Sequence, residues 1–134
     1  MIVDTSAIIA VLQDEADAAD IRAALKTAEV IRIAAPTLVE LTAVIEGKGD
    51  VRLHYQVKRL LELYEVETVP FTDEHVAIAQ RAYRDYGRGS GNPAKLNLGD
   101  CFSYALASAT NEPLLFTGDD FSNTDLVPAV RKDH

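Results

Sequence analysis

The amino-acid sequence predicts an α/β domain built around a largely parallel β-sheet. Short apolar runs typical of strands alternate along the chain with longer segments in which apolar residues recur with helical spacing. The chain has 134 residues, of which 48% are hydrophobic, and this length fits one domain with a substantial core. We therefore expect a single domain over residues 1–134.

Four short apolar runs have the length and character of strands and lie between the helical segments. They cover residues 2–3, 30–34, 66–70 and 114–117. Because helices separate them in the sequence, we expect these strands to pair largely in parallel.

The first two helical segments cover residues 14–26 and 37–46. The first is rich in alanine and begins with several acids, which suit the positive end of a helix dipole. The second is apolar nearly all round, so we expect it to be buried. Gly47 and Gly49 then mark a helix break.

The three remaining helical segments each carry an apolar stripe. Residues 51–64 form an amphipathic surface helix, and residues 73–86 form another after Thr72 or Asp73 as a possible cap. Residues 98–110 give the clearest helix. The expected stripes consist of Leu53, Val57, Leu60, Leu61 and Tyr64, then Ala79, Ala82, Tyr83 and Tyr86, and finally Leu98, Cys101, Phe102, Ala105 and Ala109. The segment 87–97, with its glycines and proline, reads as an exposed loop.

Composition excludes several classes of protein. One cysteine cannot form an internal disulfide, so a disulfide scaffold is excluded and a reducing compartment is natural. No apolar run approaches the roughly 20 residues that span a bilayer, and the opening residues lack the basic and apolar regions of a signal peptide. We therefore expect a cytoplasmic protein with no membrane partner.

The balance of charge is acidic, with 21 Asp and Glu against 13 Lys and Arg and a formal net charge of −8. Such a balance argues against nucleic-acid binding through global charge. It leaves room for a local basic patch, or for a carboxylate site that holds cations.

Two acids are candidate site residues because of their positions in the predicted sheet and helices. Asp4 comes after the first strand, and ligands of open parallel sheets gather beyond the carboxyl ends of the strands. Its alternative role is to cap a helix that starts near Ser6. Glu40 lies among apolar residues, where an unpaired carboxylate costs several kcal/mol, so it is protonated, bound to a cation or paired with an arginine.

Three further acids occupy comparable positions. Asp100 lies in the first turn of the 98–110 helix, where the helix dipole alone is a sufficient reason for a carboxylate. Gly99 beside it leaves room for a ligand or another backbone. Asp119 and Asp120 follow the last strand, and their alternative role is an ordinary polar turn.

A parallel sheet would bring these scattered acids together. Clustered carboxylates repel one another, and a divalent cation is the usual way to neutralise them. An all-oxygen ligand set points to Mg²⁺ or Mn²⁺, because zinc prefers histidine and cysteine.

At these same positions the sequence resembles the PIN-domain ribonucleases, and within them the VapC-type toxins of toxin–antitoxin pairs. Four segments in the same order carry the resemblance, which extends over essentially the whole chain. They are residues 3–7 (VDTSA), 36–40 (PTLVE), 96–107 (LNLGDCFSYALA) and 113–121 (PLLFTGDDF).

The resemblance implies a three-layer α/β/α sandwich with a central parallel sheet and an acidic pocket for Mg²⁺ or Mn²⁺. Asp4, Glu40 and Asp100 match the first three acids of the family, with Asp4 and Asp100 as direct or water-mediated metal ligands. The fourth acid is either Asp119, counted from Thr117, or Asp120, counted back from Phe121. The supporting hydroxyls would be Thr5, Ser6 and Thr117.

The resemblance also implies an endoribonuclease in which metal-activated water hydrolyses RNA, whether tRNA, rRNA or mRNA. A basic cluster on and after the 73–86 helix is the best candidate for phosphate contacts, although a solvated helix face would look the same. It consists of Arg81, Arg84, Arg88 and Lys95. Further implied partners are a cognate antitoxin and a second copy of the chain. The apolar stripes at 53–64 and 73–86 could supply the dimer surfaces, although packing within the chain explains them as well.

Two other functions fit the residues. A phosphatase could use Asp4 as its nucleophile, although position 6, where such sites generally carry a second acid, is serine. A non-catalytic interaction domain could use the same acids only to bind a metal or a basic partner.

Overall fold

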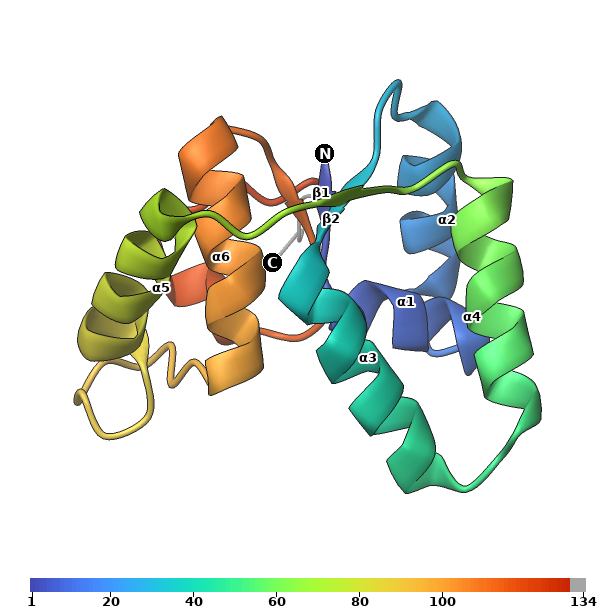
Figure 1. Cartoon of the computed structure of the whole chain (residues 1–134), viewed down its shortest axis with the longest axis horizontal. Coiled ribbons are helices and arrows are strands. Elements are labelled where there is room, and N and C mark those ends of the chain that lie inside the picture. Colours follow the sequence, from blue (N-terminus) through green and yellow to red (C-terminus); the bar gives the residue numbers. More distant parts are fainter. Residues whose placement is uncertain (131–134) are drawn as a thin grey trace.

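The computed structural model describes residues 1–130, in which four parallel strands form a central sheet (Figure 1). The strands are β1 (Ile2–Val3), β2 (Arg32–Ala34), β3 (Glu67–Val69) and β4 (Leu114–Leu115), in the spatial order β3-β2-β1-β4. Every pairing is parallel, with Ile2 aligned to both Arg32 and Leu114. The expected parallel sheet is thus confirmed, with the last three strands shorter than the apolar runs that predict them.

In the described part of the chain, six α-helices enclose the sheet (Figure 1). They are α1 (Thr5–Leu12), α2 (Ala18–Thr27), α3 (Ala35–Lys48), α4 (Arg52–Leu63), α5 (Asp73–Tyr86) and α6 (Leu98–Thr110), followed by the short 3₁₀ helix η1 (Asp120–Asn123). Helices α5 and α6 lie on one side of the strands and α1, α2 and α4 on the other. This arrangement is the expected α/β/α sandwich.

The two faces of the sheet supply two separate cores. Because successive side chains of a strand point to opposite faces, Val3, Ile33 and Leu115 pack among the apolar residues of α1 to α4. Ile2 and Leu114 point the other way and pack against α6. Strand β1, only two residues long, therefore contributes to both cores at the point where Asp4 follows it.

The first predicted helix was wrong in its extent. Residues 5–12 form a helix of their own, and the second helix starts only at Ala18. Between them Asp14 adopts the left-handed conformation, with φ of 50°, and the Glu15 amide donates to the Ala10 carbonyl at 2.9 Å. This turn ends α1, so the acids at 14–17 form a connection and do not begin a long helix.

Helix α3 is not buried all round as its composition suggests. Only Thr37, Leu41 and Ile45 are buried, one stripe at a spacing of four residues. Val39 is 72% exposed. Leu38 is partly buried against the same core, whereas Val39 and Val44 on the other side of α3 are exposed.

The last two stripes were also partly wrong, whereas the 51–64 stripe was confirmed by the burial of Leu53, Val57 and Leu60. Tyr83 of α5 is exposed, and Leu98 at the start of α6 is 64% exposed. Helix α6 lies between the sheet and α5, so residues on several of its sides are buried. A central helix of this kind does not follow a one-stripe pattern.

No helix in the part of the chain that the structure describes is long and apolar enough to cross a membrane.

Candidate active site

Asp4 lies at the carboxyl end of β1 and is 2% exposed. Its Oδ2 accepts hydrogen bonds from the Ser6 amide at 3.0 Å and the Ser6 hydroxyl at 2.7 Å, which makes Asp4 the N-cap of α1. Its Oδ1 accepts a 2.6 Å hydrogen bond from the Ser103 hydroxyl of α6. Burial raises the pKa of Asp4, and these hydrogen bonds partly offset that rise. Asp4 is therefore both a helix cap and a buried acid beside α6.

Glu40 of α3 faces the same region. Its Oε1 accepts a 2.6 Å hydrogen bond from the Thr5 hydroxyl, and the backbone of Gly99 lies against its carboxylate so closely that a side chain on Gly99 would overlap it. Burial, partly offset by the Thr5 hydrogen bond, raises the pKa of Glu40, and the charge of Asp4 adds to the rise. Among the described residues, no arginine forms an ion pair with Glu40.

Asp100 is held by the cap of its own helix. The Asn97 amide donates to Asp100 Oδ2 at 3.0 Å, and the Asp100 amide donates to Asn97 Oδ1 at 2.9 Å, a reciprocal pair known as a capping box. The pKa of Asp100 rises to about 7, chiefly through burial and also through the charges of Asp4, Asp120 and Glu40. The Asn97 hydrogen bond acts in the opposite direction.

The carboxylates of Asp4, Glu40 and Asp120 thus all lie close enough to act on the pKa of Asp100. The four acids come from four separate segments of the chain. Asp119 and Asp120 are both exposed at the turn that starts η1. The charge of Asp120 acts on Asp100, and this observation favours Asp120 as the fourth acid of the cluster.

The acidic cluster suits a divalent cation by its chemistry. Between residues 1 and 130, the structure contains no group of three or more His, Cys, Asp or Glu side chains already arranged to hold a metal ion. The donors are carboxylate oxygens, which Mg²⁺ and Mn²⁺ prefer, and their mutual repulsion helps raise the pKa of Asp100. A bound cation would relieve that repulsion, so the residues present fit such an ion.

A family model described as PIN domain matches residues 1–126 of the chain. The chain belongs to the PIN-domain family. The VapC ribonuclease Mb2780c of Mycobacterium bovis is 48% identical over 129 residues, which cover 96% of this chain and 98% of the relative. Ribonuclease VapC28 of Mycobacterium tuberculosis is 46% identical over 130 residues, which cover 97% of this chain and 98% of that relative. The resemblance seen in the sequence is therefore confirmed.

Solved structures share this PIN fold. The crystal structure of Mycobacterium tuberculosis VapC20, described as a Sarcin-Ricin loop cleaving toxin, superimposes with a TM-score of 0.74 at 17% identity and 98% coverage of both chains. A toxin–antitoxin complex from Klebsiella pneumoniae gives a TM-score of 0.67 at 16% identity, again with 98% coverage of both chains. At such low identity these matches support the fold alone.

Two of the three expected supporting hydroxyls of the PIN domain contact its acids directly. Thr5 donates to Glu40, and Ser6 donates to Asp4. Thr117 contributes through its backbone, because its amide donates to the Ser6 hydroxyl at 3.1 Å. These bonds link the start of α1 to α3, to the end of β1 and to the segment after β4.

Sequence reasoning missed Ser103 and Asn97. Both lie within one helical turn of Asp100, Asn97 three residues before it and Ser103 three residues after it. The spacing of three residues was the available signal, since residues so placed are neighbours along a helix surface.

The four expected RNA-binding residues are all exposed. Arg81 and Arg84 lie on α5, whereas Arg88 and Lys95 line one hollow of about 610 Å³ in the loop that joins α5 to α6. The base of this loop is closed by hydrogen bonds from the Arg88 amide to the Leu96 carbonyl and from the Leu96 amide to the Tyr86 carbonyl. The structure thus places two of the four basic side chains, those of Arg88 and Lys95, at the same hollow.

Proposed function

We propose that this chain is a VapC-type endoribonuclease, the toxin of a toxin–antitoxin pair, that hydrolyses RNA phosphodiester bonds with Mg²⁺ or Mn²⁺ held at the acidic cluster. The observation that carries the proposal is the convergence of Asp4, Glu40, Asp100 and Asp120, whose combined charge helps raise the pKa of Asp100 to about 7. Full-length VapC relatives at 46–48% identity support the choice of RNA as the substrate.

Each acid has a role in this proposal. Asp4 and Asp100 would hold the cation, while Glu40 and Asp120 would complete its surroundings or orient the attacking water. When bound, the cation supplies a water of lowered pKa and screens the charge that develops on the phosphate. Because water and not the 2′-hydroxyl attacks, the products carry a 5′-phosphate and a 3′-hydroxyl.

The basic cluster holds the substrate. The acids repel RNA, so cations elsewhere on the same chain are needed to bind its phosphates. Arg88 and Lys95, which line the same loop hollow, are the centre of this surface, and Arg81 and Arg84 extend it along α5.

We place the activity in the cytoplasm.

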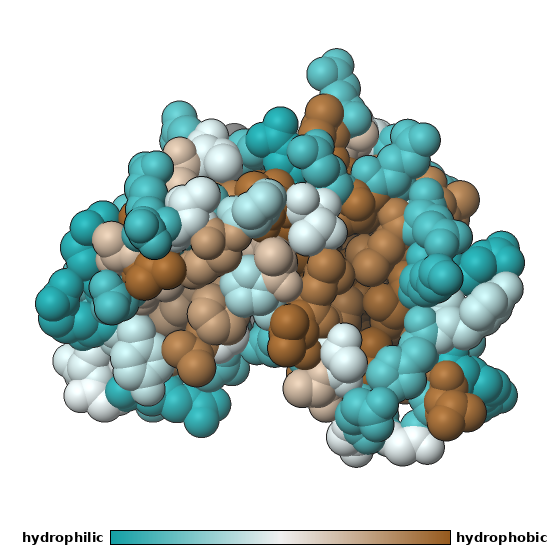
Figure 2. Space-filling view, viewed as in Figure 1, coloured by the Kyte–Doolittle hydropathy of each residue, from teal (hydrophilic) through white to brown (hydrophobic). Residues whose placement is uncertain are grey.

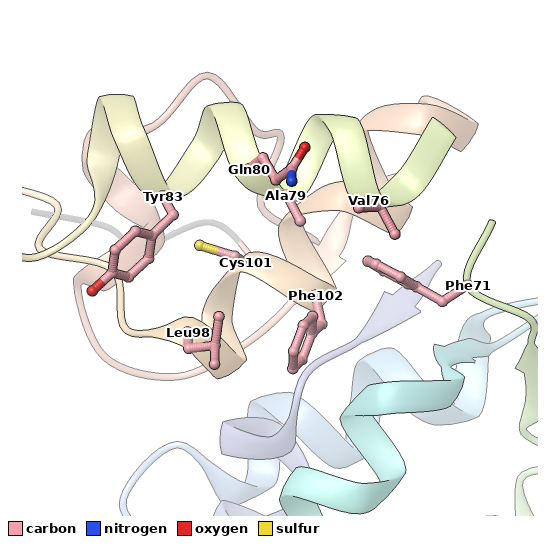
Figure 3. Close-up of a pocket in the computed structure, with 8 residues that line it drawn as sticks. All are labelled: Phe71, Val76, Ala79, Gln80, Tyr83, Leu98, Cys101 and Phe102. Atoms are coloured by element: carbon pink, nitrogen blue, oxygen red, sulfur yellow. The ribbon is translucent and has the colours of Figure 1, made fainter. Parts of the chain in front are cut away.

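A second copy of the chain covers the apolar face of α5 and α6. Between these helices lies a hollow of about 440 Å³, lined among others by Phe71, Val76, Tyr83, Leu98 and Phe102 (Figure 3). Apolar side chains also reach the surface over this part of the molecule in Figure 2. Three of the lining side chains are large and exposed, namely those of Val76, Tyr83 and Leu98. Apolar side chains gathered at a surface hollow suit contact with another protein, and two identical patches can close on each other.

The expected stripe at 53–64 does not serve this purpose, because Leu53, Val57 and Leu60 already pack within the chain's own core. The acidic balance of the surface, with a net charge of −8, fits an antitoxin that binds through a basic segment.

The function is tested by cleavage of RNA with the wild-type chain and an Asp4→Asn variant. Asparagine caps helices as well as aspartate does, so α1 keeps its cap while the charge toward the cation is lost. We expect Asp4→Asn to abolish cleavage, as EDTA does for the wild type, and Asp20→Asn on the exposed face of α2 to leave it unchanged.

Full activity of Asp4→Asn, or undiminished activity in EDTA, contradicts the metal-dependent mechanism. If the wild type binds Mn²⁺ but cleaves no RNA, the non-catalytic interaction domain is the better explanation. Mapping the new RNA ends after brief induction of each form identifies the target.

A further inference from the structure

Ser103 is a buried hydroxyl in direct contact with the acidic cluster. It lies on α6, its side chain is completely buried, and its Oγ donates to Asp4 Oδ1 at 2.6 Å. Such a short distance is typical of a hydrogen bond to an ionised carboxylate. The two residues are 99 positions apart in the sequence, so this bond joins the start of the chain to its last helix.

Asp4 is held at both of its oxygens. Ser6 of α1 donates to Oδ2, and Ser103 of α6 donates to Oδ1. The Ser6 amide and hydroxyl both donate to Oδ2, so these two bonds do not by themselves fix the position of Oδ1. With one hydroxyl from each of two helices, the plane of the carboxylate is fixed relative to both helices.

Helix α6 also carries Asp100, three residues before Ser103 and therefore next to it along the helix surface. The bond from Ser103 thus ties Asp4 to the same rigid element that positions Asp100. The distance between the two acids proposed to hold the cation depends on this connection.

We propose that Ser103 is the positioning residue that orients Asp4 for cation binding. This inference rests on the proposed function, because it assigns Asp4 to the cation. Ser103 itself is not a catalytic residue, since it acts only through the carboxylate that it holds. Groups that orient metal ligands in this way typically contribute about ten- to a hundredfold to metal affinity or activity.

The structure offers a matched control in Thr37. Its side chain is also completely buried, and its Oγ1 lies 3.5 Å from Ser103 Oγ, so its hydroxyl reaches Ser103 and not the Asp4 carboxylate. Thr37→Val removes a buried hydroxyl from the same place at nearly constant volume. It therefore separates the general cost of losing a buried hydroxyl from the loss of the bond to Asp4.

The test measures Mn²⁺ binding by titration calorimetry for the wild type, Ser103→Ala, Ser103→Cys and Thr37→Val. Cysteine fills the space of serine but donates only a weak hydrogen bond. We expect Ser103→Ala to lower Mn²⁺ affinity about ten- to a hundredfold, Ser103→Cys to lower it similarly, and Thr37→Val to retain the wild-type value. In RNA cleavage, the kcat of Ser103→Ala should fall while its KM stays unchanged.

Wild-type Mn²⁺ affinity in Ser103→Cys or Ser103→Ala overturns the inference, as does an equal loss in Thr37→Val. Cooperative thermal unfolding of each metal-free variant shows that it is folded, and if Ser103→Ala fails this check the cysteine variant decides. A wild type that binds Mn²⁺ and cleaves no RNA contradicts the proposed function alone, since the calorimetric comparison still tests Ser103.

Discussion

Gly99 determines where the Glu40 carboxylate can lie, because any side chain at this position would overlap it. Helix propensity alone would make Gly99→Ala stabilising, since alanine is the better helix former. We expect instead that the methyl group displaces Glu40 and lowers the rate of RNA cleavage about a hundredfold, the scale that follows from a displacement near 1 Å.

The control for this substitution is Gly47→Ala in α3, where a methyl group meets nothing within 4 Å. It should keep the wild-type cleavage rate and stabilise the chain by about 0.5–1 kcal/mol in thermal or urea unfolding. Equal cleavage rates in the two variants would show that Gly99 does not control Glu40.

The raised pKa of Asp100 makes the stability of the chain depend on pH. In the metal-free folded chain this pKa is about 7, against an ordinary value of 3.8. Between the two values the folded chain keeps a proton that the unfolded chain has lost, so the free energy of unfolding falls as pH rises from about 4 to about 7. Above about pH 7 Asp100 no longer contributes to the free energy of unfolding, so this part of the pH dependence levels off.

The measurement is urea unfolding in EDTA across this pH range, for the wild type and Asp100→Asn. The variant should show a shallower decline, with a residual slope from the raised pKa values of Asp4 and Glu40. Identical slopes for the two chains would contradict the assignment to Asp100.

The acids of the site could be found in the sequence because a charged residue at a strand end or among apolar residues stands out. Ser103 was not singled out, because its bond to Asp4 spans 99 positions and its spacing of three residues from Asp100 was the one local signal. The choice between Asp119 and Asp120 also depends on distances across the fold, because both follow the same strand.

At the scale of elements, the caps of α5 and α6 are alike in form but differ in what they position. Thr72 accepts a bond from the His75 amide and Asn97 accepts one from the Asp100 amide. Thr72→Ala and Asn97→Ala should each cost about 1 kcal/mol of unfolding free energy. Only Asn97→Ala should also slow RNA cleavage, because its cap holds Asp100. A comparable loss of cleavage in Thr72→Ala would mean that helix stability and not the position of Asp100 limits activity.

The order and type of the later elements were predictable because their apolar residues recur with strand or helix spacing between clear boundaries. A helix starting near Ser6 was expected only as the alternative role of Asp4, and the extent of α1 was not predicted, because its residues after Ser6 are all apolar and give no amphipathic pattern. The exposed side of α3 was missed for a related reason, since composition does not reveal whether an apolar face meets the core or a partner.

At the scale of the whole molecule, the apolar face over α5 and α6 predicts the oligomeric state. We expect the wild type to be a dimer in light scattering and Leu98→Glu to be a monomer, because a charge in an apolar interface is costly to desolvate. The matched control is Leu63→Glu on α4, where the leucine is 74% exposed and lies outside the hollow. A dimeric Leu98→Glu, or a monomeric wild type, would contradict this surface.

The distribution of charge predicts how RNA binding responds to salt. Reversing Arg84 and Arg88 to glutamate should weaken binding of RNA to the inactive Asp4→Asn chain. The slope of log affinity against log salt concentration should become shallower by roughly 0.7 for every phosphate of a single strand that the variant no longer neutralises. A control with Lys26→Glu and Arg59→Glu makes the same change in net charge away from the loop. Binding that falls equally in both would indicate an effect of net charge alone.

The loop between α5 and α6 is closed at its base and anchored by the buried side chains of Ala94 and Leu96. Residues 89–93 therefore extend from a loop whose base is fixed by hydrogen bonds and buried side chains. Asn97, which caps α6, comes directly after the buried Leu96. We therefore expect substitutions in residues 89–93 to leave the position of Asp100 unchanged. If the loop binds RNA as proposed, a change in residues 89–93 would alter the RNA preference while the acids of the site keep their positions.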